Sequence, residues 1–515
     1  VRTPLHKSLS RNEMYVMFEY IHQSVNVTSA LVFFAVLLVV HYITKRTAGV
    51  PPCPTPVLPI LGNLLHLLVN TDALEYFRRL RDKYGNVFSL YMGSRLIIVI
   101  NGYTTIKEAL VQNGRVFSNR PKNYLTEVLT GDNGILCTSG EKWKEHRRFA
   151  MNALQELGFG RSSFEQNIIE EAKELINIIE EKSGRPFQMK GIVNTCVSNI
   201  ISQIVFGKRF KHTDANFMKF LNKLDEAARL VANTSVLVNC FPLLQYLPGD
   251  PMKMRLLQKY QREFDKWYEE MLNEHKNTYK EGEARDYIDF YISEARRREN
   301  SGTPSTFTDT QLYTVIRDLF GGGSETSATS IIWALLHFLH FPEIQRKCFE
   351  ELDRVVGRDR LPSLKDKDHM PYLEATILEV LRVYPVIPLP MPHAVSQDVL
   401  FHGYHIPQGT TIIVNLDSVL RDPVIFKHPE KFRPERYLDV DGRLDKPLEH
   451  ISFSLGRRFC PGESVARMEL FLFLAALIQN FEFQPVEGKQ LPELKGILGI
   501  TFSPAPFLIR AVKRV

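Results

Sequence analysis

The stretch "FSLGRRFCPGE", residues 453–463, places a single cysteine, Cys460, among two arginines and two glycines. A lone thiol is most often a buried structural side chain, although it can also act as a nucleophile, bind zinc or hold a haem iron. A nucleophile needs a nearby base and zinc needs three more ligands, and this stretch supplies neither. An axial thiolate needs only one cysteine, and Gly456 and Gly462 leave room for the loop around its sulfur. By itself, the stretch leaves the buried thiol and the iron ligand open.

The composition indicates a large folded protein and excludes several classes. The chain has 515 residues, of which 44% are hydrophobic, so it can bury a sizeable core. A net charge of +6, from 64 basic and 58 acidic residues, is too small and dispersed to indicate nucleic-acid binding. The six cysteines are far apart and none forms a C-x-x-C pair, which argues against zinc ribbons and thioredoxin-like sites.

An N-terminal membrane anchor is expected. No Asp, Glu, Lys or Arg occurs from residue 20 to 44, and residues 31–40, "LVFFAVLLVV", are wholly apolar. With its flanks this segment approaches the roughly 20 apolar residues that span a bilayer. Lys45 and Arg46 follow, which favours a cytosolic location for everything after the anchor. We expect a retained anchor rather than a signal peptide, because no small-residue cleavage site follows the segment. Met14 is a candidate for the natural start.

The rest of the chain is predicted to form one large, mainly α-helical unit. Five prolines between residues 51 and 59 predict a stiff spacer, and short strands are expected within residues 86–101. Beyond about residue 140 the pattern is helical, with no repeat and no low-complexity linker. The predicted division is a lumenal tail and anchor (1–47), a proline-rich hinge (48–63) and a globular domain (64–515).

The longest predicted helix begins at Thr308, where Gln311 would complete a capping box, and continues to about residue 341. Three glycines, 321–323, lie near its middle, and each costs a helix interior about 1 kcal/mol relative to alanine. They could form a loop between two shorter helices. Alternatively, they could let a continuous helix approach a flat, bulky ligand, to which Glu325 and Thr326 would present an acid and a hydroxyl as a proton relay.

Glu379 and Arg382 lie three residues apart on the helix that ends before Pro385, so they share one face. An isolated pair of this kind is usually a solvated surface pair. Here the neighbouring residues are apolar, which favours burial, and Arg436 in "RPERY" is a candidate third member.

Two further features of the sequence can be explained without any functional role. Trp143 and Arg147 in "KWKEHRR" lie one helical turn apart, a spacing that an amphipathic helix with a basic edge also explains. His393, after a proline-rich run, could equally be an ordinary surface histidine.

Taken together, these segments resemble the cytochrome P-450 superfamily, and in particular its microsomal family-2 members. The cysteine loop F-x-x-G-x-R-x-C-x-G is matched by Phe453, Gly456, Arg458, Cys460 and Gly462. The helix pattern [AG]-G-x-[DE]-T-[TS] is matched by residues 322–327, and E-x-x-R, the "PERY" segment and W-x-x-x-R are all present in the family's order. The resemblance covers essentially the whole chain. Cys53, where the hinge usually has glycine, is one departure from the family pattern.

The resemblance implies a P-450 fold, a helical bundle with small β-sheets around haem b, iron protoporphyrin IX. Cys460 would be the proximal thiolate ligand of the iron, and Phe453, Gly456 and Gly462 in the same loop would also belong to the cofactor-binding site. Glu325 and Thr326 would deliver protons on the distal side. The propionate contacts would come from Arg458, His393, Trp143 and Arg147, and the buried structural triad would be Glu379, Arg382 and Arg436.

The activity implied is a monooxygenase that inserts one oxygen atom of O2 into a lipophilic substrate such as a fatty acid, a steroid or a xenobiotic. Electrons would come from NADPH through NADPH–cytochrome P-450 reductase, with cytochrome b5 as a possible second donor. The location would be the endoplasmic reticulum membrane, through a single N-terminal anchor, with the catalytic domain in the cytosol. Two alternatives remain: a haem-thiolate isomerase or dehydratase acting on lipid peroxides, and a non-catalytic haem sensor or lipid-binding protein.

Overall fold

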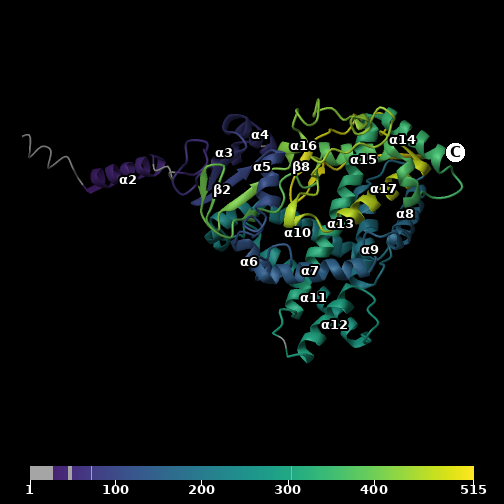
Figure 1. Cartoon of the computed structure of the whole chain (residues 1–515), viewed down its shortest axis with the longest axis horizontal. Coiled ribbons are helices and arrows are strands. Elements are labelled where there is room, and N and C mark those ends of the chain that lie inside the picture. The colour runs from purple at the N-terminus through teal and green to yellow at the C-terminus, as the bar shows by residue number, and fades with distance from the viewer. Residues whose placement is uncertain (1–26, 45–48, 71, 303, 515) are drawn as a thin grey trace, which may run out of the picture.

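The computed structural model describes residues 27–44, 49–70, 72–302 and 304–514 (Figure 1). The tail expected at residues 1–26, including Met14, and the basic pair Lys45 and Arg46 lie outside these described residues. The apolar segment forms helix α2 (Val27–Thr44). Among the described residues, the structure contains no helix with the length and apolar character that crossing a membrane requires. The anchor stays a prediction.

The fold is mainly helical, as predicted. After α2 the helices are α3 (Leu64–Val69), α4 (Ala73–Tyr84), α5 (Tyr103–Lys107), α6 (Tyr124–Thr130), α7 (Gly140–Glu156), α8 (Glu165–Glu180), α9 (Lys190–Phe206), α10 (Ala215–Cys240), α11 (Met254–Thr278), α12 (Tyr287–Asn300), α13 (Asp309–His340), α14 (Pro342–Val355), α15 (Pro371–Val383), α16 (Asp417–Leu420) and α17 (Glu463–Asn480). Short helical turns are η1 (Glu108–Gln112), η2 (Ser162–Phe164), η3 (Pro242–Tyr246), η4 (Leu364–His369), η5 (Pro434–Tyr437) and η6 (Gly456–Arg458).

The centre of the main hydrophobic core is helix α13, which packs against α9 and α17. It is continuous across the three glycines, so the helical alternative is correct and the loop alternative is wrong. Trp333, fully buried on α13, donates its indole N–H to the carbonyl of Phe502 at 2.9 Å. Helix α17 is buried over most of its length, in keeping with a sequence that is apolar on nearly all of its faces.

The start of α13 departs in one detail from the prediction. Thr308 caps the helix by accepting the N–H of Gln311 at 3.2 Å. The side chain of Gln311 does not bond back to Thr308; it accepts the N–H of Gly134 at 3.0 Å and donates to the Gly134 carbonyl at 3.2 Å. The predicted capping box is therefore half formed, because a loop distant in sequence takes the glutamine amide.

The largest sheet lies at the end of the body nearest α2, beside α3, α4 and α5 (Figure 1). Its order is β1-β2-β6-β3, with β2 and β6 parallel and the other pairs antiparallel. The two strands expected within residues 86–101 are confirmed. The strands are β1 (Val87–Met92), β2 (Arg95–Ile100), β3 (His393–Ala394), β4 (Val399–Phe401), β5 (Tyr404–Ile406), β6 (Thr411–Val414), β7 (Phe481–Gln484), β8 (Gly496–Leu498), β9 (Phe502–Pro504) and β10 (Arg510–Lys513).

The proline-rich segment lies against the globule. Ser89 on β1 donates its N–H to the Pro52 carbonyl at 2.8 Å and its hydroxyl to the Pro51 carbonyl at 2.7 Å. Asn63 donates to the Pro54 carbonyl at 2.8 Å. Prolines lack an N–H but keep their carbonyl acceptors, which is how this segment is attached to the edge of β1. The predicted division of the chain at residues 47 and 63 stays a prediction.

Candidate functional site

The cysteine loop holds the sulfur of Cys460 at the start of α17. The loop closes through the Cys460 N–H, which donates to the Phe453 carbonyl at 3.1 Å. Burial raises the pKa of the Cys460 thiol, whereas backbone hydrogen bonds from Gly462 and Glu463 and the nearby charge of Arg147 lower it. Those amide donors and that cation are the surroundings that stabilise a thiolate once a metal ion has displaced the proton.

The two glycines of the loop have different structural roles. Gly456 has φ +73°, and a Cβ on it would lie 2.0 Å from the carbonyl oxygen of Leu110 in η1. Any larger residue would therefore clash with backbone. Gly462 is the N-cap of α17, and a Cβ on it would lie 3.9 Å from Cys460 Sγ. The space expected around the sulfur is thus found at Gly462, whereas Gly456 accommodates a neighbouring segment.

Three arginines gather next to this loop without a carboxylate partner in the described part of the chain. Arg458 is buried and donates to the carbonyls of Ser118, Ile135 and Thr138. Burial and the nearby charges of Arg120 and Arg147 lower the pKa of Arg458 to about 8. The other two arginines also bind backbone carbonyls: Arg120 donates to those of Leu136, Met391 and Pro392, and Arg147 to that of Phe459.

Trp143 adds an unused donor to this cluster. Its ring lies 3.6 Å from the guanidinium carbon of Arg458, and its buried indole N–H has no hydrogen-bond partner among the described residues. A buried N–H without an acceptor, beside uncompensated cations, calls for an anion. The carboxylates of the two haem propionates match this donor set, so the residues present fit the cofactor.

His393 is buried on β3, where Nδ1 lies 2.6 Å from the Phe117 carbonyl. Burial and the nearby charges of Arg120 and Arg458 lower its pKa to about 3. The imidazole is therefore neutral in these surroundings, and a carboxylate placed beside it would raise that pKa. It is not the surface histidine that the sequence also allowed.

On α13, Glu325 and Thr326 have separate partners. The Thr326 hydroxyl donates to the Gly322 carbonyl at 2.8 Å. Glu325 Oε1 accepts from Lys190 Nζ at 3.3 Å and from the Thr501 hydroxyl at 3.2 Å. The acid is thus held by residues from α9 and from the turn before β9, which sequence patterns did not single out.

The glycines before this pair are not equivalent. A Cβ on Gly323 would lie 3.0 Å from the side chain of Ile201, so this glycine lets α9 approach α13 closely. A Cβ on Gly321 or Gly322 would meet no atom within 4 Å. Only the first two glycines therefore remain candidates for a face that lies against a ligand.

Glu379, Arg382 and Arg436 come together in a buried network. Arg382 donates Nε and Nη2 to Glu379 at 2.8 and 2.9 Å, and both side chains are 0% exposed. Arg436 Nε donates to the same carboxylate at 3.0 Å, as does the backbone N–H of Arg433 at 2.8 Å. This network connects α15 to η5 and leaves no oxygen of Glu379 without a donor.

Comparisons with known proteins show the family of this chain. The family model described as Cytochrome P-450 matches residues 51–510. Cytochrome P-450 2U1 of Mus musculus is 37% identical over 489 residues, which cover 91% of this chain and 92% of the relative. Two proteins of Homo sapiens are similar over comparable lengths. Cytochrome P-450 2J2 is 38% identical over 479 residues (92% and 93% of the two chains), and cytochrome P-450 2D6 is 36% identical over 491 (94% and 97%).

Proposed function

Since the chain belongs to the cytochrome P-450 family, whose members bind haem through a cysteine thiolate, we propose that it inserts one oxygen atom of O2 into a lipophilic substrate. The observation that carries the proposal is the environment of Cys460. Its sulfur lies at the N-terminus of α17, accepts backbone hydrogen bonds from Gly462 and Glu463, and is close to Arg147. One sulfur in these surroundings suits an axial iron ligand.

The bound haem supplies the iron at which O2 is activated. The protein supplies ligation through Cys460 and, in our assignment, anchors the propionates with Arg120, Arg147, Arg458 and the free indole N–H of Trp143. His393 would join them as its pKa rises next to a carboxylate. Of these residues, Arg120 has no counterpart in the sequence patterns.

We assign the movement of protons to Thr326 and Glu325. The Thr326 hydroxyl, now bonded to the Gly322 carbonyl, can rotate to donate its proton on the distal side, and Glu325 would return a proton to it after taking one up from the Lys190 ammonium, which regains its proton from solvent. Lys190 and Thr501 orient the Glu325 carboxylate. Retention of this acid and hydroxyl side by side favours O2 chemistry over the isomerisation of a peroxide, which needs no proton supply of this kind.

The substrate is proposed to be an apolar molecule, with fatty acids and other lipids favoured. The pocket would use residues 120–130, 215–235, 316–326, 386–390 and 497–501. Of these, 386–390 and 497–501 are close together, since the Phe502 N–H donates to the Val386 carbonyl at 2.7 Å. Apolar side chains predominate in "VIPLP" and "ILGIT", which suits a substrate that partitions into lipid.

Electrons are proposed to come from NADPH through NADPH–cytochrome P-450 reductase, with cytochrome b5 as a second donor. The surface of this chain on which an acidic partner would dock includes four basic residues: Lys142, Lys144 and Arg148 on α7, and Arg457 in the cysteine loop. Arg457 is close to the site, with its guanidinium 5.9 Å from the ring of Trp143. The proposed location is the cytosolic face of the endoplasmic reticulum membrane.

The thiolate assignment is tested by the absorption spectrum of the reduced carbon-monoxide complex. The parent protein should show the band of a thiolate-ligated haem, and Cys460→Ala should lose it. Cys348→Ala, which changes another buried cysteine, is the matched control and should keep the band. An unchanged band in Cys460→Ala contradicts the assignment.

Catalysis is tested with purified reductase, NADPH and a panel of lipids and xenobiotics. We expect substrate-dependent oxidation, and Thr326→Ala should consume NADPH while releasing more peroxide per molecule of product. A haem sensor would show neither turnover nor a change in Thr326→Ala. A peroxide isomerase would turn over without reductase, so either result contradicts the proposal.

A further inference from the structure

A second cluster of metal-type ligands lies apart from the cysteine loop. Glu171 on α8, Cys196 on α9 and His212 in the segment before α10 bring a carboxylate oxygen, a thiol sulfur and an imidazole nitrogen within 4.8 Å of one another. Glu171 and Cys196 are fully buried and His212 is nearly so. His212 is separated by 16 residues from Cys196 and by 41 from Glu171, so no short motif in the sequence announces the cluster.

The distances from the His212 nitrogen to the other two ligand atoms are close to those expected around one tetrahedral ion. His212 Nε2 lies 3.1 Å from Glu171 Oε2 and 3.9 Å from Cys196 Sγ. With Zn–N, Zn–O and Zn–S bonds of about 2.05, 2.1 and 2.3 Å, tetrahedral angles require about 3.4 Å between nitrogen and oxygen and about 3.6 Å between nitrogen and sulfur. The two distances to His212 therefore each need a shift of about 0.3 Å to meet the geometry, and the third pair, Glu171 and Cys196, lies within 4.8 Å.

Surrounding groups hold the carboxylate while leaving it able to bind. Arg209 pairs with Glu171 Oε1, and Asn199 donates to Oε2 at 3.3 Å. Asn199 is itself fixed by two hydrogen bonds to the backbone of Phe210, at 2.9 Å each. Partners of this kind orient the first ligands of a metal ion. The partly exposed side chain of Arg209 marks the side from which an ion can enter.

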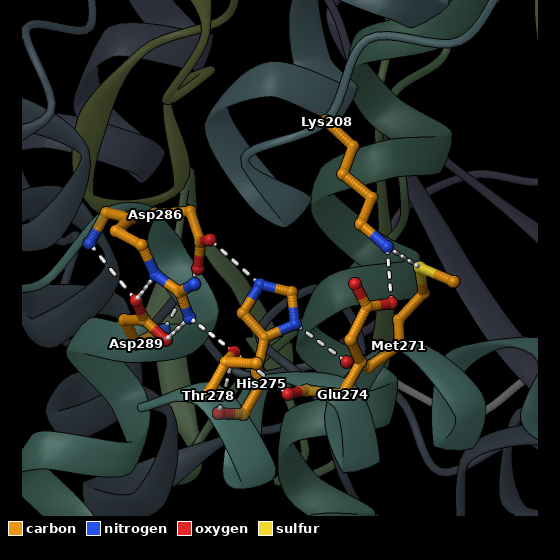
Figure 2. A network of polar contacts seen from close by, with 8 residues as sticks. Lys208, Met271, Glu274, His275, Thr278, Asp286 and Asp289 are labelled. Atoms are coloured by element: carbon orange, nitrogen blue, oxygen red, sulfur yellow. Dashed lines mark hydrogen bonds and ion pairs between the residues drawn. The ribbon is translucent and has the colours of Figure 1, made fainter. Parts of the chain in front are cut away.

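The structure contains a second candidate cluster, and its bonding is different. Figure 2 shows His275, Asp286 and Asp289, which are also buried together. There Arg285 binds both oxygens of Asp289, at 2.6 and 3.1 Å, and His275 Nε2 lies 2.8 Å from Asp286 Oδ2. The carboxylates of both clusters have polar partners, but this second cluster has no sulfur, whereas the Glu171 cluster combines a thiol, an imidazole and a carboxylate. We therefore favour the Glu171 cluster.

We propose that Glu171, Cys196 and His212 bind one Zn²⁺, with a water molecule as the fourth ligand. A mixed set of thiolate, imidazole and carboxylate suits zinc, in contrast to the all-oxygen sites of magnesium and calcium. On binding, the Cys196 S–H bond breaks, the S–Zn bond forms and one proton is released to solvent. No electron is transferred. The ion would join α8 and α9 to the segment that leads into α10, three residues after His212.

The test uses the full-length haem-loaded protein and Zn²⁺ alone. After equilibration with zinc and dialysis, we expect one zinc per iron by elemental analysis. Zinc K-edge absorption should show one sulfur neighbour at about 2.3 Å with lighter neighbours near 2.0–2.1 Å. Calorimetry in two buffers of different ionisation enthalpy should report about one released proton per zinc.

Variants separate this site from adventitious binding. His212→Asn and Cys196→Ala should each weaken zinc binding at least 10-fold. The matched controls Cys348→Ala, at another buried cysteine, and His402→Asn, at an exposed histidine beside Glu108, should bind as the parent does. If Cys196→Ala does not fold, His212→Asn and the parent spectrum decide. No retained zinc, zinc without a sulfur neighbour, or unchanged affinity in His212→Asn overturns the proposal.

Discussion

Replacing Gly456 by alanine should damage the cysteine loop without removing the iron ligand or any side chain proposed to bind the haem propionates. The new Cβ would lie 2.0 Å from the Leu110 carbonyl oxygen, and ordinary contact begins near 3.4 Å, so backbone must move by about 1.4 Å. Alanine at φ +73° costs roughly 1–2 kcal/mol, and overpacking adds roughly 1–3 kcal/mol. The free energy of unfolding should fall by roughly 2–5 kcal/mol.

Gly442→Ala is the matched control, since Gly442 has φ +75° and a Cβ there would meet no atom within 4 Å. This control should lose only the roughly 1–2 kcal/mol of the left-handed backbone. Urea unfolding followed by circular dichroism gives both losses, and the reduced carbon-monoxide spectrum gives the fraction of thiolate-ligated haem. That fraction should fall in Gly456→Ala and hold in Gly442→Ala. Equal losses in both variants would refute the role assigned to the approach of Leu110.

Three further outcomes are expected. Glu379→Gln should lower the free energy of unfolding by roughly 3–5 kcal/mol, because it leaves two buried arginines without a counter-charge. The control Glu141→Gln, in an exposed ion pair, should change it little. The urea midpoints of the two variants and the parent protein measure the difference. Burial lowers the pKa of His275, but the hydrogen bond and charge of Asp286, the Met271 carbonyl and the charge of Asp289 together raise it more, so the net shift is upward from 6.5 (Figure 2). The stabilisation is thus full below pH 6.5 and lost as pH rises through the higher folded value, and His275→Gln should remove this dependence of the unfolding midpoint. Trp143→Phe removes an indole N–H that has no partner in the described part of the protein, so haem should dissociate faster in a transfer assay while the urea midpoint stays nearly unchanged.

The sequence predicted those elements whose signals are local. Pro342 and Pro371 are the first residues of α14 and α15, where a residue without an N–H fits, and α17, which is buried over most of its length, is apolar almost all round. The cysteine loop and the Glu379–Arg382 pair were found because their members lie within a few residues of one another. Caps, helix faces and short motifs depend on spacing along the chain, so they can be read without knowing the fold.

Tertiary structure decided the features whose partners are distant along the chain. Gln311 bonds to Gly134 instead of completing its capping box, and Lys190 reaches Glu325 across 135 residues. Arg120 lies near Arg458 because its loop and the cysteine loop meet in the fold, and no periodic pattern in the sequence indicates this contact. The sequence alone indicated that a small residue is needed at Gly456, but only the tertiary packing showed that the reason is the close approach of the Leu110 carbonyl. Local rules fix where helices and turns occur, whereas burial and close approach of segments determine which charges and donors meet.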